Sequence, residues 1–265
     1  MVIVLELPDK IASKLTKKFG IQDNIGMSGA YVYLFDDMVL KVQPSSVESD
    51  NEVEMMRWLA HKLPVPQVIE HIKTNKLSYL LMSRCTGEYA CADTMMANPR
   101  RLSECLAKVI HQIWDIDIQN CPVNQSLEQK LIAAENNVIN GLVDVDNCEP
   151  DTFGAKGFKN PETLLYWLQT NRPNEKFVLS HGDMCLPNIF FCDNLLSGLI
   201  DLGRSGISDK WCDVAICYRS LKHNYDGIYS GMKLNGFQET YFFDALQLKP
   251  DWDRIRYYLL LDELF

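Results

Sequence analysis

Short apolar runs separated by polar turns fill the first third of the chain. Their β-branched, aromatic and aliphatic residues are typical of strands, and three such runs lie at 31–35, 38–42 and 79–82. Between the second and third runs, apolar residues recur at helical spacing at Val53, Met56, Leu59 and Leu63. This spacing predicts a helix over about 51–62. We expect a small, mainly antiparallel sheet with one helix.

Long helical patterns dominate after Gly87. One runs from about 101 to 118, and its apolar face carries Leu102, Leu106, Val109 and Ile113. Strand-like runs reappear only around 178–179, 189–191 and 198–200. The change of pattern predicts an α+β fold with an N-terminal lobe over 1–87 and a larger, mostly helical C-terminal lobe over 88–265. Turns are expected at 64–66 and 84–87.

Charge narrows the range of partners. The 265 residues include 26 Lys and Arg against 35 Asp and Glu, a formal charge of −9, so we expect no nucleic-acid partner. The first 87 residues hold 10 basic and 10 acidic residues, and the remainder 16 and 25. No apolar run has membrane-spanning length and the N-terminus lacks a signal-peptide pattern, so no membrane partner and a cytoplasmic location are expected.

Nine cysteines are scattered along the chain without a C-x-x-C pair. The five histidines supply no H-x3–5-H partner, so a structural metal cluster is not expected. In a reducing compartment these cysteines are interpreted as small, partly buried hydrophobic residues.

The segment 180–189 carries the strongest chemical signal. Asp183 is followed five residues later by Asn188, and Asp201 then opens a D-x-G turn, the spacing by which kinases assemble a base and metal ligands. A carboxylate at Asp183 can orient or deprotonate an attacking hydroxyl. The oxygens of Asn188 and Asp201 suit Mg2+. Two adjacent hairpin strands, with a turn over 192–194, would direct these three side chains toward one cleft.

Upstream elements fit the same chemistry in order along the chain. Gly26, Met27 and Ser28 lie in a Gly/Ser turn whose backbone N–H groups can cradle phosphates. Lys41 follows one strand later, and Glu52 lies eleven residues beyond it on the expected helix. This is the order in which a strand lysine contacts phosphates and a helix glutamate orients it.

A competing interpretation pairs His181 with Cys185 as a base and a nucleophile. It leaves the glycine turn, Lys41, Asn188 and Asp201 without a role, so we favour the kinase interpretation.

Several segments resemble the bacterial aminoglycoside 3'-phosphotransferases, antibiotic-resistance kinases with a two-lobe, protein-kinase-like fold. The resemblance spans about 21–265 and is carried by the residues at 26–28, 181–188, 198–206, 209–213 and 257–265. The segment 198–206 (GLIDLGRSG) and the C-terminal nine residues (YYLLLDELF) are more specific to this family than the general kinase motifs.

The resemblance implies roles on the nucleotide side. Asp183 matches the catalytic base, and Asn188 and Asp201 match the magnesium ligands. Lys41 matches the lysine on the α- and β-phosphates, supported by Glu52.

Further nucleotide contacts follow from the same resemblance. Ser28 matches the loop residue above the β-phosphate, in the same turn as Gly26 and Met27. Backbone groups near Ser83 and Cys85 lie where the hinge between the lobes would hold adenine. The implied cofactors are ATP and Mg2+, with GTP left open.

On the acceptor side, Arg204 matches a residue that borders the aminoglycoside site. Asp262, Glu263 and the Phe265 carboxylate would face the amines of the antibiotic, and Asp213 is expected to brace the catalytic loop.

The run 144–151 has four acidic residues among eight. Glu149 and Asp151 in this run are further candidates for binding a polycationic acceptor, and a solvated acidic loop is the alternative.

The expected activity is transfer of the γ-phosphoryl group to the 3'-hydroxyl of an aminoglycoside such as kanamycin or neomycin, by a monomer or weak dimer. A kinase for choline, homoserine or a macrolide is the alternative, because it would share the core motifs. A pseudokinase is less favoured because Lys41, Asp183, Asn188 and Asp201 are all present. A protein kinase is disfavoured because only a short segment separates Gly203 from the next helix-like stretch.

Overall fold

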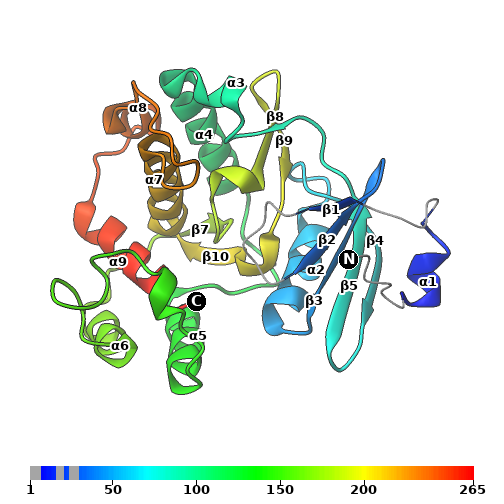
Figure 1. Cartoon of the computed structure of the whole chain (residues 1–265), viewed down its shortest axis with the longest axis horizontal. Coiled ribbons are helices and arrows are strands. Elements are labelled where there is room, and N and C mark those ends of the chain that lie inside the picture. Colours follow the sequence, from blue (N-terminus) through cyan, green and yellow to red (C-terminus); the bar gives the residue numbers. More distant parts are fainter. Residues whose placement is uncertain (1–6, 16–20, 24–29) are drawn as a thin grey trace.

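An antiparallel sheet of five strands forms the N-terminal part of the fold (Figure 1). The computed structural model describes residues 7–15, 21–23 and 30–265. The strands follow the order β1-β2-β3-β5-β4 and are β1 (Ile21–Asp23), β2 (Tyr31–Leu34), β3 (Met38–Pro44), β4 (Val68–Lys73) and β5 (Leu77–Ser83). A short helix, α1 (Asp9–Ala12), precedes them. The three predicted strands are confirmed, whereas β4 was not predicted because its half-buried residues include Glu70 and His71.

Helix α2 (Val47–Leu59) packs beside the sheet and confirms the predicted helix with a shift in its ends. It begins four residues before the predicted start because Ser46 and Ser49 form a reciprocal cap. Val53, Met56 and Leu59 are buried in one core with the sheet residues Val39 and Leu80 and with the C-terminal helices.

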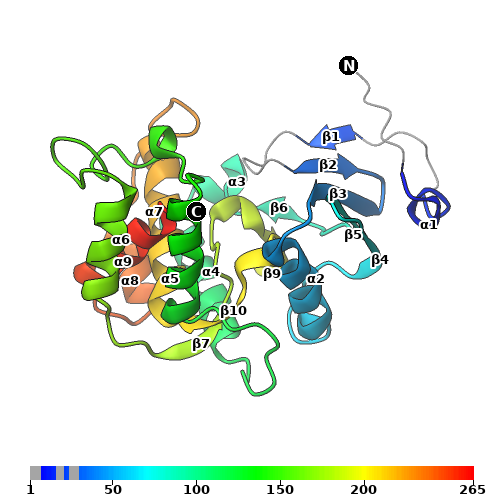
Figure 2. The ribbon, with the colours of Figure 1, turned by 90° about the horizontal axis from the view of Figure 1, so that it is seen from below.

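The C-terminal part of the chain is mainly helical. Its helices are α3 (Asp93–Met96), α4 (Pro99–Trp114), α5 (Leu127–Ile139), α6 (Pro161–Thr170), α7 (Lys210–Asp226), α8 (Glu239–Ala245) and α9 (Trp252–Asp262). Figure 2 shows these helices on one side of the molecule and the five-stranded sheet with α2 on the other. Helix α4 ends at Trp114, four residues before the predicted end. None of the helices in the described ranges is long and apolar enough to cross a membrane.

Two small sheets flank the segments that carry Asp183, Asn188 and Asp201. One pairs β6 (Glu88–Tyr89), β8 (Ile189–Cys192) and β9 (Leu195–Leu199), and the other pairs β7 (Phe177–Ser180) with β10 (Gly206–Asp209). The expectation that strands reappear only in three places was wrong for β10, because its single large apolar residue, Ile207, gives no alternating pattern. The turn between β8 and β9 has Asp193 and Asn194 at φ of 51° and 63°, which suits a tight hairpin.

Candidate active site

Three charged side chains from different elements meet on the side of the five-stranded sheet that faces α2. Lys41 on β3 donates from Nζ to Glu52 Oε1 on α2 at 2.9 Å and also to Asp201 Oδ1 beyond β9. Gln43 Nε2 donates to the second oxygen of Glu52 at 3.0 Å. Lys41 is 7% exposed and Glu52 is 2% exposed, so the pair is held away from water. This geometry fixes the lysine ammonium where strand, helix and hairpin meet.

The charges in this cluster favour the ionised forms of Lys41 and Asp201. Burial alone would lower the pKa of Lys41, but Glu52 and Asp201 outweigh it and raise the pKa well above its ordinary value. Burial alone would raise the pKa of Asp201, but the adjacent Lys41 ammonium lowers it. Lys41 therefore stays protonated and Asp201 stays ionised at neutral pH.

The D-x-G sequence has a local structural reason. Asp201 adopts a left-handed backbone, with φ of 60° and ψ of 55°, which is unusual for a residue other than glycine. Two residues later the chain passes close to α2, where a Cβ on Gly203 would lie 2.6 Å from Glu48 Cγ. A glycine at this position therefore allows the close approach between the loop and α2.

Asp183 and Asn188 lie together at the start of β8. The Asn188 side-chain amide donates to Asp183 Oδ2 at 2.9 Å and to the Asp183 carbonyl oxygen at 3.0 Å. The backbone N–H of Ile200 donates to the carbonyl of Asn188 at 3.0 Å, which fixes the end of β9 beside Asn188. Asp183 is half-buried, so its carboxylate can reach a bound substrate.

Asp213 on α7 holds the loop that carries Asp183. Its buried carboxylate accepts hydrogen bonds of 2.9 Å from Ser180 Oγ and from the backbone N–H groups of His181 and Gly182. Gly182 has φ of +84°, and a side chain there would collide with the Arg204 carbonyl oxygen. The loop is therefore held by one carboxylate and one left-handed glycine.

A cavity of about 190 Å³ lies between the sheet and this loop. Its wall includes Lys41, Glu52, Asn188 and Asp201, together with apolar residues and the expected hinge residues Ser83 and Cys85. The apolar residues are Val32, Leu34, Val39, Met82, Phe190 and Ile200. A wall that combines charged groups with apolar residues suits a nucleotide. Gly26, Met27 and Ser28 lie outside the described residues.

The oxygen donors at the cavity fit a magnesium ion held partly by phosphates. Among the described residues, no group of three or more His, Cys, Asp or Glu side chains is placed to hold a metal by itself. Mg2+ commonly takes only one or two protein ligands and completes its shell with phosphate oxygens and waters. Asn188 and Asp201 line the same cavity, so the donor set fits this mode of binding.

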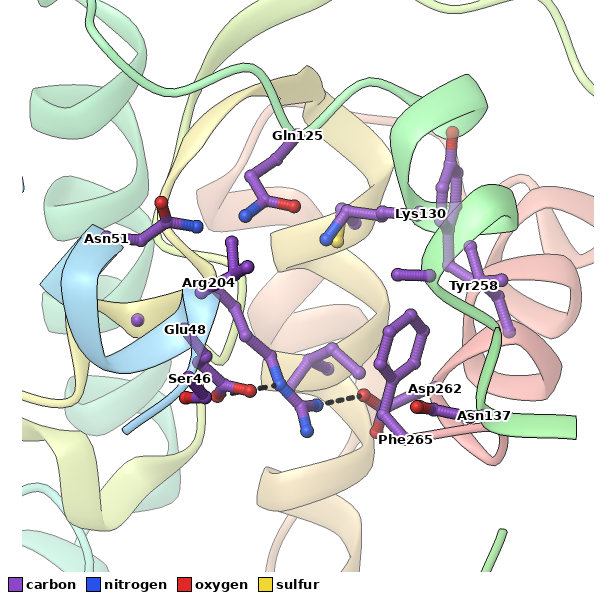
Figure 3. A pocket seen from close by; sticks show the side chains of 17 residues that line it. Ser46, Glu48, Asn51, Gln125, Lys130, Asn137, Arg204, Tyr258, Asp262 and Phe265 are labelled. Atoms are coloured by element: carbon purple, nitrogen blue, oxygen red, sulfur yellow. Dashed lines mark hydrogen bonds and ion pairs between the residues drawn. The ribbon is translucent and has the colours of Figure 1, made fainter. Parts of the chain in front are cut away.

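Arg204 links α2 to the end of the chain (Figure 3). Its guanidinium pairs with Glu48 Oε1 and with Asp262 Oδ1, each at 3.2 Å, and lies 5.1 Å from the centre of the Phe265 ring. Arg219 on α7 pairs with Asp262 as well and lies 3.8 Å from Glu263 Oε1. Two arginines thus already neutralise Asp262.

The two candidate residues of the acidic run 144–151, Glu149 and Asp151, have different partners. The backbone N–H of Glu149 donates to Glu263 Oε2 at 3.3 Å, and Glu149 Oε1 lies 3.1 Å from His223 Nε2. Asp151, by contrast, pairs with Arg256 at 3.1 Å and has a largely exposed side chain. Glu149 therefore joins the group that contains Glu263, while Asp151 pairs with the outer face of α9.

The alternative nucleophile at Cys185 is chemically disfavoured. Burial and the neighbouring Asp183 raise the pKa of Cys185 well above its ordinary value, and a protonated thiol is a poor nucleophile. His181 is buried, and its Nδ1 lies 3.3 Å from the backbone N–H of Asp183. These contacts support a role for His181 in holding the loop.

Three further charged residues of the site, Arg219, His223 and Glu48, were not predicted from the sequence. Arg219 and His223 lie on successive turns of α7, and Glu48 lies in the first turn of α2. A charged residue on a helix has no neighbouring sequence motif that distinguishes a site residue from a solvent-exposed one. Their importance follows from their contacts with Asp262, Glu149 and Arg204.

Comparisons with known proteins agree with this geometry. The model of the phosphotransferase enzyme family (APH) matches residues 24–258. An aminoglycoside 3'-phosphotransferase of Enterococcus faecalis is 39% identical over 95% of this chain and 96% of that protein. A crystal structure of a type VIII aminoglycoside-3'-phosphotransferase superposes with a TM-score of 0.76 at 26% identity, covering 93% of this chain and 94% of that one.

A second solved structure adds ligands to the comparison. An aminoglycoside phosphotransferase of Streptomyces rimosus, in complex with ADP and streptomycin, superposes with a TM-score of 0.71 at 25% identity and covers 89% of each chain. The two-lobe, kinase-like α+β fold expected from the resemblance is confirmed.

Proposed function

This chain belongs to the phosphotransferase enzyme family, and from that premise we propose that it transfers the γ-phosphoryl group of a nucleoside triphosphate to the 3'-hydroxyl of an aminoglycoside. The observation that carries the proposal is the convergence of Lys41, Glu52, Asp183, Asn188 and Asp201 around one cleft. Relatives named as aminoglycoside 3'-phosphotransferases that match nearly the whole chain support the choice of acceptor.

Asp183 is proposed to orient the acceptor hydroxyl and accept its proton. The Asn188 amide, 2.9 Å from Asp183 Oδ2, fixes the rotamer of the carboxylate and leaves its other oxygen for the substrate. Asp213 holds the preceding backbone in place. Much of the rate enhancement of phosphoryl transfer comes from positioning of this kind.

Lys41 is proposed to contact the α- and β-phosphates, with Glu52 holding its ammonium in place. Asn188 and Asp201 would hold Mg2+, which when bound supplies positive charge to the phosphate oxygens. The side chain of Lys41 already lies beside Asp201, so the cation and this oxygen donor are prearranged.

The apolar end of the cavity is proposed to hold the base of ATP or GTP between Val39 and Phe190, with polar contacts from the backbone near Ser83 and Cys85. The turn at 26–28 would cover the phosphates. We place the boundary between the lobes at Gly87, directly after this hinge.

The acceptor is proposed to lie beside Asp183, where Arg204, Glu263, Glu149 and Phe265 approach from three elements. Glu149 is the better candidate for binding an ammonium group, because two arginines already neutralise Asp262 and Arg219 also pairs with Glu263. Asp151 contributes through the surrounding negative charge. A single amine–carboxylate contact at a partly exposed site is worth about 1 kcal/mol or less, so several contacts must act together.

Purified protein with Mg-ATP tests the proposal in an assay of ADP release, with kanamycin, neomycin, choline and homoserine as acceptors. We expect turnover with the aminoglycosides alone. Asp183→Ala should abolish turnover and keep nucleotide binding, whereas Glu104→Ala, which removes an exposed carboxylate on α4, should behave like the parent protein. Turnover with choline or homoserine and none with aminoglycosides would refute the proposed acceptor. The expected monomer or weak dimer is tested by light scattering.

A further inference from the structure

Helix α2 contacts the segment that carries Asp201 at two points, one helical turn apart. At the first point Glu52 pairs with Lys41, and Lys41 in turn pairs with Asp201. At the second point Glu48 Oε1 lies 3.2 Å from Arg204 Nε. Residues that are four apart share one face of a helix, so both contacts come from the face of α2 that is directed toward this segment.

The two backbones pass close to each other at Gly203. A Cβ on this glycine would lie 2.6 Å from Glu48 Cγ and 3.0 Å from the Glu48 carbonyl oxygen. The side chain of Glu48 therefore lies directly against the D-x-G turn. The start of α2 is itself fixed, because Ser46 and Ser49 form a reciprocal cap around it. The Glu48 carboxylate is thus attached to a well-defined helix start.

Arg204 extends this contact toward the end of the chain (Figure 3). Its Nη1 lies 3.2 Å from Asp262 Oδ1, while its Nε faces Glu48. The guanidinium is planar and rigid, so one carboxylate on each side fixes both its position and its direction. The Glu48 side chain is 56% exposed, and an exposed ion pair adds little to stability. The geometry therefore points to a role in positioning.

We propose that Glu48 is a positioning residue for phosphoryl transfer. Through Arg204 it holds the D-x-G turn against α2. The Asp201 carboxylate then remains beside Lys41, where it can receive Mg2+ together with a nucleotide. This inference rests on the nucleotide side of the proposed function, in which Asp201 is a magnesium ligand. No aminoglycoside enters the test below, so a wrong acceptor would leave its result unchanged.

Isothermal titration calorimetry measures the dissociation constant of ADP with Mg2+ and with EDTA, at constant ionic strength. The ratio of the two constants is the gain in affinity that Mg2+ provides. Glu48→Gln removes the charge and keeps the shape of the side chain. Asp50→Asn removes a charge from the same helical turn, where Asp50 pairs with Lys73 on β4, and is the matched control.

We expect the magnesium gain to be at least about fivefold smaller in Glu48→Gln than in the parent and in Asp50→Asn. ADP affinity in EDTA should be the same in all three proteins, because Glu48 does not line the nucleotide cavity. An equal magnesium gain in all three proteins, an equal reduction in Asp50→Asn, or no gain in the parent would overturn the proposal. A loss of ADP affinity in EDTA for Glu48→Gln would show a general disturbance of the cleft and would overturn it as well.

A double-mutant cycle with the same measurement tests the route through Arg204. Arg204→Gln should reduce the magnesium gain as Glu48→Gln does, and the double variant should show no further reduction, whereas additive losses would contradict this route. Thermal unfolding checks the fold. Glu48→Gln and Asp50→Asn should unfold close to the temperature of the parent, because each removes one exposed ion pair. A large fall in Glu48→Gln alone would assign Glu48 to stability and overturn the proposal.

Discussion

Replacing Asp213 with asparagine should displace the loop that carries Asp183. The carboxylate is 1% exposed, and Oδ1 accepts from Ser180 Oγ and the Gly182 N–H while Oδ2 accepts from the His181 N–H. Asparagine can keep one oxygen in place, but its NH2 group would then face a backbone N–H. At least one of the three donors then loses its acceptor. The remaining hydrogen bonds are made to a neutral amide oxygen in place of a charged carboxylate.

The loss of stability can be worked from these contacts. A hydrogen bond to a charged group contributes about 1.5–3 kcal/mol, and leaving a buried donor unsatisfied costs about 1–3 kcal/mol. We therefore expect Asp213→Asn to lower the free energy of unfolding by about 3 kcal/mol or more. Displacement of the loop by about 1 Å should lower kcat by about 100-fold, because positioning dominates phosphoryl transfer. The KM for the nucleotide should change less, since Asp213 does not line that cavity.

Asp209→Asn is the matched control. Asp209 is also fully buried and accepts from the Lys176 N–H at 3.1 Å and from Tyr258 Oη at 2.8 Å. Urea unfolding should show comparable losses of stability in both variants. Steady-state kinetics, at a temperature where both are folded, should show a large fall in kcat for Asp213→Asn alone. Equal stability losses with near-parental kcat in both variants would refute the positioning role of Asp213.

Three further predictions concern other groups. Lys41→Met should lower kcat by about 100-fold or more in the ADP-release assay, because it removes a preorganised cation; parental kcat would contradict the proposed phosphate contact. Among the nine free cysteines Cys192 is exposed and the other eight are partly or fully buried, so Cys192→Ser should remove the fastest phase in a titration of the native protein with Ellman's reagent; persistence of that phase would show that another thiol is equally accessible. Burial lowers the pKa of His223, so its neutral form stabilises the fold above about pH 6.5 and this stabilisation is lost as pH falls. His223→Gln should lose less stability between pH 7.5 and 5.5 in thermal unfolding than the parent, and an unchanged difference between these pH values would count against the titration.

The groups nearest the chemistry could be predicted because their spacing is set by local structure. Asp183, Asn188 and Asp201 lie within one loop and one hairpin, so their separation in sequence fixes their separation in space. Lys41 and Glu52 lie on an adjacent strand and helix, which the hydrophobic pattern also predicted. Local sequence patterns were therefore enough to predict most of the residues on the nucleotide side of the cleft.

The acceptor side depends on contacts between distant segments, which sequence patterns do not encode. Glu149 and Asp151 are two residues apart in an acidic run, yet one packs against Glu263 and the other pairs with Arg256. Lys130 follows polar residues on a helix and has the pattern of a solvent-facing lysine, but the packing of α5 against the C-terminal residues buries it. The sequence alone gives no sign of either outcome.

The regiochemistry of the product tests the central claim most directly. Kanamycin is incubated with Mg-ATP and the protein, and the phosphorylated product is analysed by 31P–1H correlation NMR, with a kanamycin that lacks the 3'-hydroxyl as the paired acceptor. We expect a phosphorus coupled to the proton at the 3' carbon and no product from the deoxy compound. Phosphorylation at another hydroxyl, or equal turnover of the deoxy compound, would contradict it.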